Sequence, residues 1–372
     1  MDNKQSRVGC FFVLLTNIQN CHILLRLYKY SGVLKSIQIM KNRIIPLFFI
    51  AAMSLTACGE KSYSPKDYIM ELPYKSNFKI LQLTDTHIGD KDDQDLHYAF
   101  LDKLITEADG PSKDQIDLIV VTGDLFTFAG KATAKRYFKF LDSYDIPWTV
   151  VFGNHDEQTY FSVEWMTDYL NSFGSNCMFK DIRNDNVQGN CNFAINLMDG
   201  TSVHDQLIFM DSNRYYFGSY FGYDFFKENQ IEWYDALVKE TTQGNGGAPV
   251  NSLMFYHIPL FEINDAYEKG TVIYDGPNGN GDGKREDTCP PDINSGFFQH
   301  IVDGGSTKAM FFGHDHINTF ETDYQGVKFC YGIKSTNRIY YDEDLLGYQT
   351  ITIEDSHKIS IERKFHTYEE VK

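Results

Sequence analysis

The sequence predicts an α/β protein in which two packed mixed sheets are flanked by helices, a four-layer α/β/β/α sandwich. Two observations predict this class. In the first half, short apolar runs alternate with amphipathic helical segments, whereas the second half is rich in strand-like runs with few helices between them. Strands buried on both faces are nearly continuous apolar runs, and sheets of such strands need helices to cover them. With 372 residues, 42% of them apolar, the chain is long enough for one large domain.

The first half alternates strand and helix. Strands are expected at 78–83, 117–122 and 147–152, and helices at 93–107, 131–143 and 161–173. The helix over 93–107 carries apolar residues at helical spacing, and Gly110-Pro111 is expected to end it. This half therefore resembles a set of parallel strands joined by covering helices.

The second half has longer gaps between helices. Strands are expected at 192–197, 207–210, 253–256, 309–312, 327–331, 348–353 and 358–363, with a helix over 225–240. The last three strands are expected to be antiparallel. A long insertion over 263–293 separates two segments with ligand-type residues, and such insertions often shape specificity. Within it, Arg285 either binds a phosphate or is a solvated charge.

The N-terminal region has the composition of an export signal. After Met40 come two basic residues, an apolar run over 44–53, and the segment Leu55-Thr56-Ala57-Cys58. This ending resembles a bacterial lipoprotein signal, in which Cys58 carries a lipid. An ordinary membrane anchor or a buried helix is the alternative. The resemblance implies export and anchoring to the cell envelope, on its periplasmic or outer face.

The chain divides into five expected parts. Residues 1–39 are either a gene start placed too early or a genuine extension, 40–57 the signal, and 58–75 a polar tether. Residues 76–363 form the main domain and 364–372 a tail.

The net charge of the chain disfavours one class of partner. The chain has 34 basic and 51 acidic residues; residues 1–57 hold seven of the basic ones and one acidic one, which leaves a net charge of −23 on the remainder. Such a surface repels polyanions and lacks the basic stripe that supplies most nucleic-acid affinity. Nucleic acid is therefore disfavoured as a partner.

Four cysteines lie in the main domain: Cys177, Cys191, Cys289 and Cys330. None has the Cys-x-x-Cys spacing of a metal site. Outside the cytoplasm they could pair in three ways. Cys177 with Cys191 is the favoured pair because the intervening segment is short and polar; free thiols are the alternative.

Five short segments each follow an apolar run and end in metal-ligand residue types. They read Asp85-Thr86-His87, Gly123-Asp124, Gly153-Asn154-His155-Asp156, Tyr256-His257 and Gly313-His314-Asp315-His316. Taken alone, each is weak evidence, because such dipeptides occur in ordinary turns. Together they offer enough oxygen and nitrogen ligands for two adjacent metal ions, which in hydrolases are about 3.5–4 Å apart.

The residue types suit such a centre. Asp85 and His87 are two apart at a strand end, so both side chains point the same way. The carboxylate of Asp124 can bridge two ions, and Asn154 offers a neutral oxygen. The imidazoles of His257, His314 and His316 suit iron, manganese or zinc.

The order of these segments closely resembles the calcineurin-like metallophosphoesterases over residues 76–363, and more narrowly their purple-acid-phosphatase-related branch. Supporting stretches are Tyr256-His257-Ile258-Pro259, Asn294-Ser295-Gly296-Phe297-Phe298 and Gly313-His314-Asp315-His316-Ile317-Asn318. The resemblance implies a first metal held by Asp85, His87, Asp124 and His316. It implies a second metal held by Asp124, Asn154, His257 and His314.

The resemblance also implies an activity. A hydroxide bridging the two ions, iron, manganese or zinc, would hydrolyse a small phosphomonoester. His155 would bind the phosphoryl oxygen and protonate the leaving group, with Asp156 either orienting His155 or serving as a structural loop carboxylate. A phosphodiesterase or nucleotide pyrophosphatase with the same centre is the alternative, and a non-catalytic binding module is a third reading. Oligomeric state stays open.

One position departs from the purple acid phosphatases. Those enzymes carry a tyrosine three residues after the bridging aspartate, and that tyrosine gives the colour through ferric iron. Here the position holds Thr127, and the first motif holds His87. The sequence therefore predicts a colourless protein without tyrosine-ligated iron.

Overall fold

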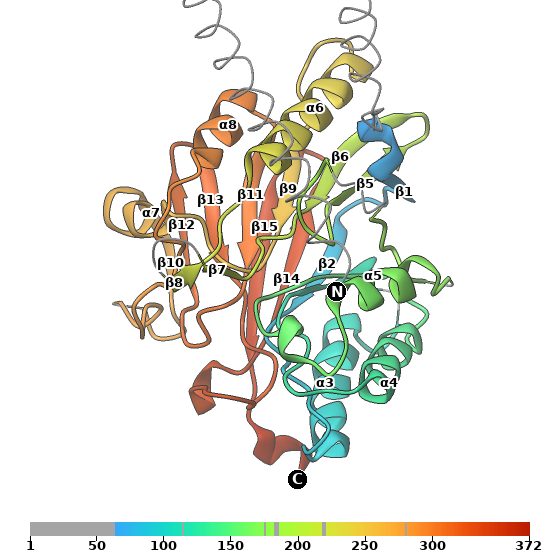
Figure 1. The fold of residues 1–372 in the computed structure, drawn as a ribbon, viewed down its shortest axis with the longest axis vertical. Helices are drawn as coiled ribbons and strands as arrows, with labels where there is room; N and C mark the ends of the chain where they lie inside the picture. The colour runs from blue at the N-terminus through green and yellow to red at the C-terminus, as the bar shows by residue number, and fades with distance from the viewer. Residues whose placement is uncertain (1–63, 114, 175, 182–185, 218–220, 280) are drawn as a thin grey trace, which may run out of the picture. The chain divides into compact units, whose positions relative to one another are not determined.

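The computed structural model describes residues 64–372, apart from 114, 175, 182–185, 218–220 and 280 (Figure 1). The predicted extension, signal segment and lipid-bearing Cys58 lie outside the described residues, so they stay predictions. Among the described helices, none is both long enough and apolar enough to cross a lipid bilayer.

The larger sheet has eight strands in the order β1-β5-β6-β9-β11-β13-β12-β10. Their bounds are Ile69–Pro73, Phe193–Asp199, Ser202–Phe209, Ser252–Phe255, Thr307–Phe312, Val327–Tyr331, Phe320–Tyr324 and Thr271–Asp275. The central strands β6, β9, β11 and β13 are parallel, whereas β5, β12 and β10 join their inner neighbours antiparallel. The parallel centre brings the carboxyl ends of β9 and β11 to one edge.

The smaller sheet has five strands in the order β15-β14-β2-β3-β4. Their bounds are Ile359–Phe365, Gly347–Ile353, Phe78–Leu83, Leu118–Thr122 and Trp148–Val151. Strands β2, β3 and β4 are parallel, and the hairpin β14–β15 adds antiparallel to β2. Both sheets are mixed, so the predicted class of two mixed sheets flanked by helices is confirmed.

Helices cover both outer faces. They are α3 Gln94–Asp109, α4 Lys131–Asp142, α5 Val163–Asn171, α6 Glu228–Gly244, α7 Ile263–Lys269 and α8 Phe297–Gly304. Figure 1 shows α6 and α8 over the larger sheet, and α3, α4 and α5 beside the smaller one. Side chains at two N-caps start their helices: Asp93 accepts from the Leu96 N–H, and Ser162 from the Trp165 N–H.

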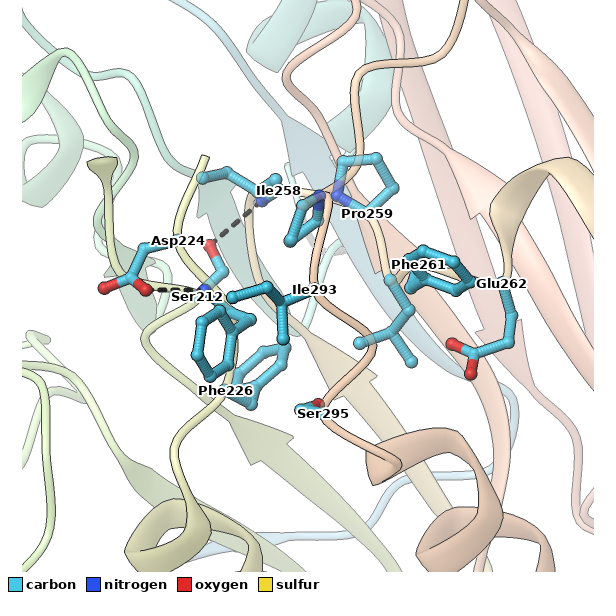
Figure 2. A pocket seen from close by; sticks show the side chains of 12 residues that line it. Ser212, Asp224, Phe226, Ile258, Pro259, Phe261, Glu262, Ile293 and Ser295 are labelled. Carbon is cyan, nitrogen blue, oxygen red and sulfur yellow. Dashed lines mark hydrogen bonds between the residues drawn. The ribbon is translucent and has the colours of Figure 1, made fainter. Parts of the chain in front are cut away.

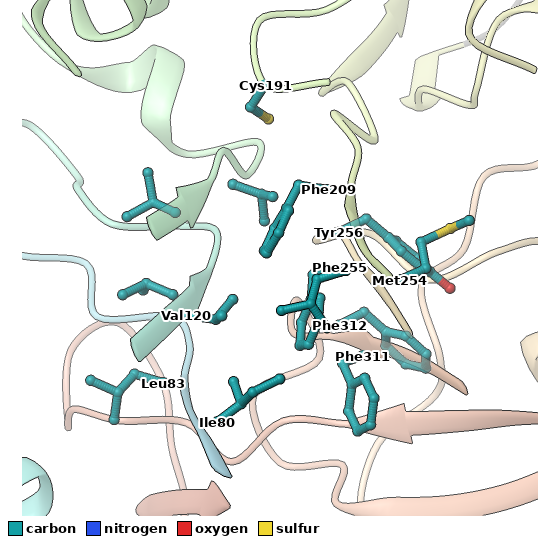
Figure 3. Packing of buried hydrophobic residues seen from close by; sticks show 14 of the residues in the cluster. Ile80, Leu83, Val120, Cys191, Phe209, Met254, Phe255, Tyr256, Phe311 and Phe312 are labelled. Atoms are coloured by element: carbon teal, nitrogen blue, oxygen red, sulfur yellow. The ribbon is translucent and has the colours of Figure 1, made fainter. Parts of the chain in front are cut away.

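Apolar side chains from both sheets form the core between them. Ile80, Leu83 and Val120 come from the smaller sheet and are fully buried with the phenylalanines of the larger one (Figure 3). Four rings stack across neighbouring strands of the larger sheet, Phe193, Phe209, Phe255 and Phe311, with centroids 4.6, 5.2 and 5.2 Å apart. This packing fixes the positions of the strand ends that carry the candidate ligands.

The predicted tether and tail are wrong in their extent. Residues expected in the tether form a short helix, Pro65–Tyr68, and strand β1, which pairs in parallel with β5. At the other end, β15 continues to Phe365, and Tyr368 is buried with its ring 4.2 Å from that of Phe100. The folded domain therefore begins before residue 76 and continues past residue 363.

The cysteine pairing is also corrected. Within the described part of the chain, Cys177, Cys191, Cys289 and Cys330 are all free thiols. Cys191 is buried and its Sγ accepts from the Phe152 N–H at 3.3 Å, whereas Cys177 Sγ lies 3.9 Å from the Leu170 carbonyl oxygen. Each favoured partner is thus held by a different backbone group, and the alternative of free thiols describes the structure.

Candidate metal centre

The predicted ligands come together where strands of both sheets end. Asp85 follows β2, Asp124 follows β3 and Asn154 follows β4, while His257 and His314 follow β9 and β11 of the larger sheet. The two sheets are joined directly here, because both carboxylate oxygens of Asp85 lie within 3.3 Å of the His314 backbone nitrogen. The carboxyl ends of five strands therefore build one site.

The backbone at this edge is unusual. Asp85, His87, Asp124 and His314 all have positive φ, at 54°, 47°, 50° and 80°. For residues with a Cβ this left-handed conformation costs roughly 1–2 kcal/mol each. The turns also demand a glycine: a Cβ on Gly123, whose φ is 85°, would lie 2.4 Å from Nδ1 of His257. The chain therefore adopts costly turns at the residues that bring the ligand side chains together.

One group of four side chains surrounds Asp85. It consists of Asp85, His87, Asp124 and His316, all buried, with one potential ligand atom each within 4.8 Å of the others. The Nε2 atoms of His87 and His316 are 3.0 Å apart, and Oδ1 of Asp85 lies 3.4 Å from Nε2 of His316. Two ligands at right angles on one ion, each about 2.1 Å from it, are separated by about 3.0 Å. The spacing suits a shared cation.

A second group shares Asp124. It consists of Asp124, His257 and His314, with the same mutual spacing of ligand atoms. Oδ1 of Asp124 accepts the His155 N–H at 2.8 Å. Its Oδ2 lies 3.6 Å from Nε2 of His87 and 3.2 Å from Nε2 of His257, between the two groups. Asp124 is thus placed as a carboxylate that belongs to both.

Some buried atoms that could bind a metal ion at this centre have no hydrogen-bond partner. They include Oδ1 of Asn154 and Nε2 of His314, whereas Nε2 of His257 lies 3.2 Å from Oδ2 of Asp124. Buried polar atoms are normally satisfied, and leaving one unpaired costs about 1–3 kcal/mol. Neutral imidazole nitrogens and an amide oxygen are ligands for divalent ions. These atoms fit the two-metal site that the sequence predicts.

The other ring nitrogens orient the ligands. The Nδ1 atoms of His257 and His316 lie 2.8 and 2.9 Å from the backbone oxygens of Thr122 and Tyr340. Nδ1 of His87 lies 2.8 Å from Oγ1 of Thr127. Such outer partners fix the ring orientation and the tautomer of metal-binding histidines. Thr127, at the position where purple acid phosphatases have tyrosine, thus supports His87; its motif position gave no signal for this role.

The electrostatics of the group favour positive charge. Burial lowers the pKa of His314 to about 3 and also lowers the pKa of His87, so both are neutral. Burial would raise the pKa of Asp124, but the adjacent His257 lowers it to about 2. Burial would likewise lower the pKa of His257, yet Asp124 and Asp85 raise it to about 10. The two buried carboxylates, Asp85 and Asp124, therefore stabilise a positive charge that lies between them.

The two predicted catalytic residues differ from each other in placement. His155 is half-buried, and its ring centroid lies 4.9 Å from that of His87. Its Nδ1 contacts Oε1 of Gln158 at 2.8 Å. Asp156 is fully buried and accepts the N–H groups of Phe126 and Gly153 at 3.0 and 2.8 Å. The expectation that Asp156 orients His155 is therefore wrong: Asp156 is a structural loop carboxylate, and Gln158 orients the imidazole.

Two further residues have structural partners. Arg285 forms ion pairs with Asp282, Asp342 and Asp344, so its charge is already compensated and the phosphate-binding interpretation is wrong. Ser212 accepts the Ile258 N–H at 3.0 Å through Oγ (Figure 2). It therefore holds the backbone immediately after His257.

Residues 78–318 match the model of the calcineurin-like phosphoesterase family. A protein of Arabidopsis thaliana named "Probable inactive purple acid phosphatase 29" is 28% identical over 68% of this chain and 71% of its own length. A second, "Probable inactive purple acid phosphatase 28", is 29% identical over 68% and 69%. A dimetal phosphatase from Danio rerio has the same fold, with a TM-score of 0.50 and 13% identity over 78% of this chain and 97% of that one.

Proposed function

Because this chain belongs to the calcineurin-like phosphoesterase family, we propose that it is a two-metal phosphoesterase that hydrolyses phosphomonoesters. The first ion is held by Asp85, His87, Asp124 and His316, and the second by Asp124, Asn154, His257 and His314. The observation that carries the proposal is the set of buried, unpartnered ligand atoms around the shared carboxylate of Asp124.

The ions supply two things when bound: Lewis acidity toward the phosphoryl group, and a water whose pKa falls to about 7. The choice among iron, manganese and zinc follows from availability as much as from these mixed nitrogen and oxygen ligands. With Thr127 in place of a tyrosine, the loaded protein is expected to be colourless.

His155 is the residue to which we assign the transfer of a proton. It stands beside His87 but belongs to neither ligand group, and it is partly exposed. With Nδ1–H donated to Oε1 of Gln158, its other nitrogen is left to carry a proton to the leaving alkoxide. The same imidazolium would hold a phosphoryl oxygen before the bond breaks.

The test is hydrolysis by protein reconstituted with Mn²⁺, Fe²⁺ or Zn²⁺, measured as initial rates on a chromogenic phosphomonoester and on its diester. Asp124→Asn is expected to abolish turnover. Asp205→Asn, the same change at a buried aspartate outside the centre, is the matched control and should retain it. A diester preferred over the monoester would select the alternative, a phosphodiesterase or nucleotide pyrophosphatase.

A second candidate follows from the names of the relatives. Both Arabidopsis proteins carry the word "inactive", which suggests a non-catalytic module on the same fold. All seven candidate ligand side chains and His155 are present here, which favours catalysis over that reading. Protein that holds two ions but hydrolyses neither ester would move the assignment to a binding module.

The N-terminal sequence supports a proposal about location. We propose that the chain is exported and held in the cell envelope by a lipid on Cys58, which brings the centre to small phosphate esters outside the cytoplasm. Mass spectrometry of the mature protein should show a lipidated N-terminal Cys58. A peptide that begins before Met40 would contradict both the signal and the proposed start.

A further inference from the structure

A hairpin of aromatic residues lies apart from the two main sheets. Strands β7, Tyr215–Phe217, and β8, Phe221–Tyr223, pair with each other alone in a two-stranded antiparallel sheet. An isolated hairpin of this size is marginally stable by itself. It is therefore held by what it packs against.

The hairpin contacts the second ligand group directly. The Tyr215 hydroxyl oxygen accepts a hydrogen bond from Nδ2 of Asn154 at 3.1 Å. The ring of Tyr223 meets that of His314 edge to face, with centroids 4.4 Å apart. The Tyr215 and Tyr223 rings stack on each other at 5.8 Å. Two neighbouring aromatic rings thus form a wall beside Asn154 and His314.

This wall continues to the surface. The ring of Phe217 lies 6.4 Å from that of Tyr215, and the residue is 76% exposed. Phe261, four residues after His257, is 44% exposed and lines a cleft of 580 Å³ together with Tyr223. Figure 2 shows Phe261 on the loop that follows Ile258 and Pro259. Ligand pockets commonly have volumes of about 300–1,000 Å³, so the cleft has room for a ring system.

The charges of the residues that line the cleft restrict which groups can bind there. The residues that line it are Gly222, Tyr223, Phe261, Asn264, Asp265, Thr288, Cys289, Pro290, Pro291 and Asp292. Two are acidic, and none of these lining residues is a lysine or an arginine. Oδ1 of Asp265 pairs with Nζ of Lys269 at 2.7 Å, so Asp292 is the lining residue that would repel an anionic group at close range. Exposed aromatic side chains that gather at one site usually mark a binding surface.

From these contacts we propose that Tyr215, Tyr223 and Phe261 form a subsite for the leaving group of the substrate, selective for a planar aromatic group without negative charge. This inference rests on the proposed phosphoesterase activity of the adjoining centre. Stacking on aromatic side chains tolerates many ring systems, because every such ring offers a flat face. The subsite therefore defines a class: monoesters whose alcohol carries an uncharged aryl or heteroaryl ring.

The test compares alcohols of similar leaving ability on the full, metal-loaded protein. Benzyl phosphate should have kcat/KM at least about 10-fold above ethyl phosphate, as stacking interactions generally supply. Cyclohexylmethyl phosphate, of similar size but not planar, and 4-carboxybenzyl phosphate, planar but charged, should both fall below benzyl phosphate. Equal rates for benzyl and cyclohexylmethyl phosphate would overturn the proposed selectivity for planar groups. Equal rates for benzyl and 4-carboxybenzyl phosphate would overturn the proposed selectivity for uncharged groups.

Substitutions locate the subsite. Phe261→Ala should lower kcat/KM for benzyl phosphate by about 5- to 10-fold and leave ethyl phosphate unchanged. Phe128→Ala is the matched control for Phe261→Ala, because Phe128 is also exposed, at 59%, but does not line the cleft as Phe261 does. An unchanged benzyl-to-ethyl ratio in Phe261→Ala would overturn the proposal.

Two further measurements distinguish failure of the aryl subsite from failure of the proposed phosphoesterase activity, and an aryl ligand from a lipid surface. If no ester is hydrolysed, the proposed activity fails, and calorimetry with benzylphosphonate and ethylphosphonate tests the subsite alone; equal affinities would overturn it. The rival occupant is a lipid surface. Binding to phosphatidylglycerol vesicles that is lost in Phe217→Ala, together with preference for a long-chain alkyl phosphate, would overturn the aryl subsite in favour of that surface.

Discussion

Two groups of histidine and aspartate side chains lie at opposite edges of the sheets, and hydrogen bonding distinguishes them. At the metal centre, Oδ1 of Asn154 and Nε2 of His314 are buried without a hydrogen-bond partner. In the second group, His204, Asp205 and His357, Nδ1 of both histidines hydrogen-bonds to Oδ2 of Asp205. Similar composition therefore gives two outcomes: one group leaves ligand atoms unpaired, and the other is satisfied by its own hydrogen bonds.

The second group lies at the edge away from the metal centre. His357 is in the turn after β14, whose last residue, Ile353, pairs with Phe78 at the start of β2. The metal ligand Asp85 follows the other end of β2. His204 and Asp205 are likewise near the start of β6, whose far end leads toward the centre.

Irregular backbone builds both groups. The register of β5 with β6 shifts between Leu197↔Asp205 and Met198↔Val203, which leaves His204 as an extra residue in a bulge. Bulges re-aim side chains, and this one allows two consecutive residues to meet. His357 has a φ of 63°, as unusual as the turns at the metal ligands. Costly backbone thus marks both clusters, and only unpaired donor atoms single out the metal site.

The largest expected effect is on kcat, which should fall for a substitution beside the metal centre and not for one in the second group. His155→Ala should lower kcat by about 10²- to 10⁴-fold, because the leaving group loses its proton donor, while the bound metal stays the same. His357→Ala, the matched change at the other edge, should leave kcat unchanged. Steady-state kinetics with metal analysis checks both. Full activity in His155→Ala would remove this residue from the reaction.

Removal of the metal ions should lower the stability of the folded state, and the second group should not contribute to this loss. Ions present at 100 times their dissociation constant stabilise the folded state by about 2.7 kcal/mol, so chelation should lower Tm by several degrees. The double variant His204→Ala/His357→Ala should show the same loss on chelation as the wild type. Differential scanning calorimetry with and without EDTA measures it. A smaller chelation effect in the double variant would mean that the second group also binds metal.

A single hydroxyl should tune the affinity of the centre. Thr127→Val keeps the shape of the side chain but removes the partner of His87 Nδ1, and changes of this kind cost about 10- to 100-fold in metal affinity. Competition with a chromogenic chelator measures it. Thr149→Val is the control, since this buried hydroxyl has no hydrogen-bond partner. Equal affinities in the two variants would show that Thr127 does not support His87.

The smallest effect concerns pH. Burial raises the pKa of Asp205 above its usual value of 3.8, although its hydrogen bonds to His357 and His204 oppose this. Between the unfolded and the folded pKa, the folded state binds the proton more tightly, so this group's contribution to stability falls as pH rises. Asp205→Asn should remove that slope and change stability at pH 7 by about 1 kcal/mol or less. Urea unfolding between pH 4 and pH 8 tests it; an unchanged slope would contradict the assignment.

The sequence predicted the metal centre better than its surroundings. Each ligand follows a buried apolar run, and carboxyl ends of parallel strands meet at one edge, so chain order was sufficient to gather Asp85, Asp124 and His257. The sequence did not predict the roles of residues whose contacts depend on the exact course of a loop. Asp156 and Gln158 both stand close to His155 in the chain, and only the geometry shows which one contacts it.

The same limit applies to the fold. The segment before residue 76 is polar and contains Pro65 and Pro73, which suggested a tether. Strand β1 is at the edge of its sheet and only partly buried, and an edge tolerates proline and polar residues. The hairpin β7–β8 was missed because its short aromatic strands lack an alternating pattern.

The most direct test is the number of ions bound by each chain. After reconstitution and desalting, inductively coupled plasma mass spectrometry should find two ions per wild-type chain. It should find two in His204→Ala/His357→Ala as well, and fewer than two in Asp124→Asn. Three ions in the wild type that fall to two in the double variant, or two ions retained in Asp124→Asn with unchanged affinity, would contradict the claim that the unpaired donors around Asp124 define the metal site.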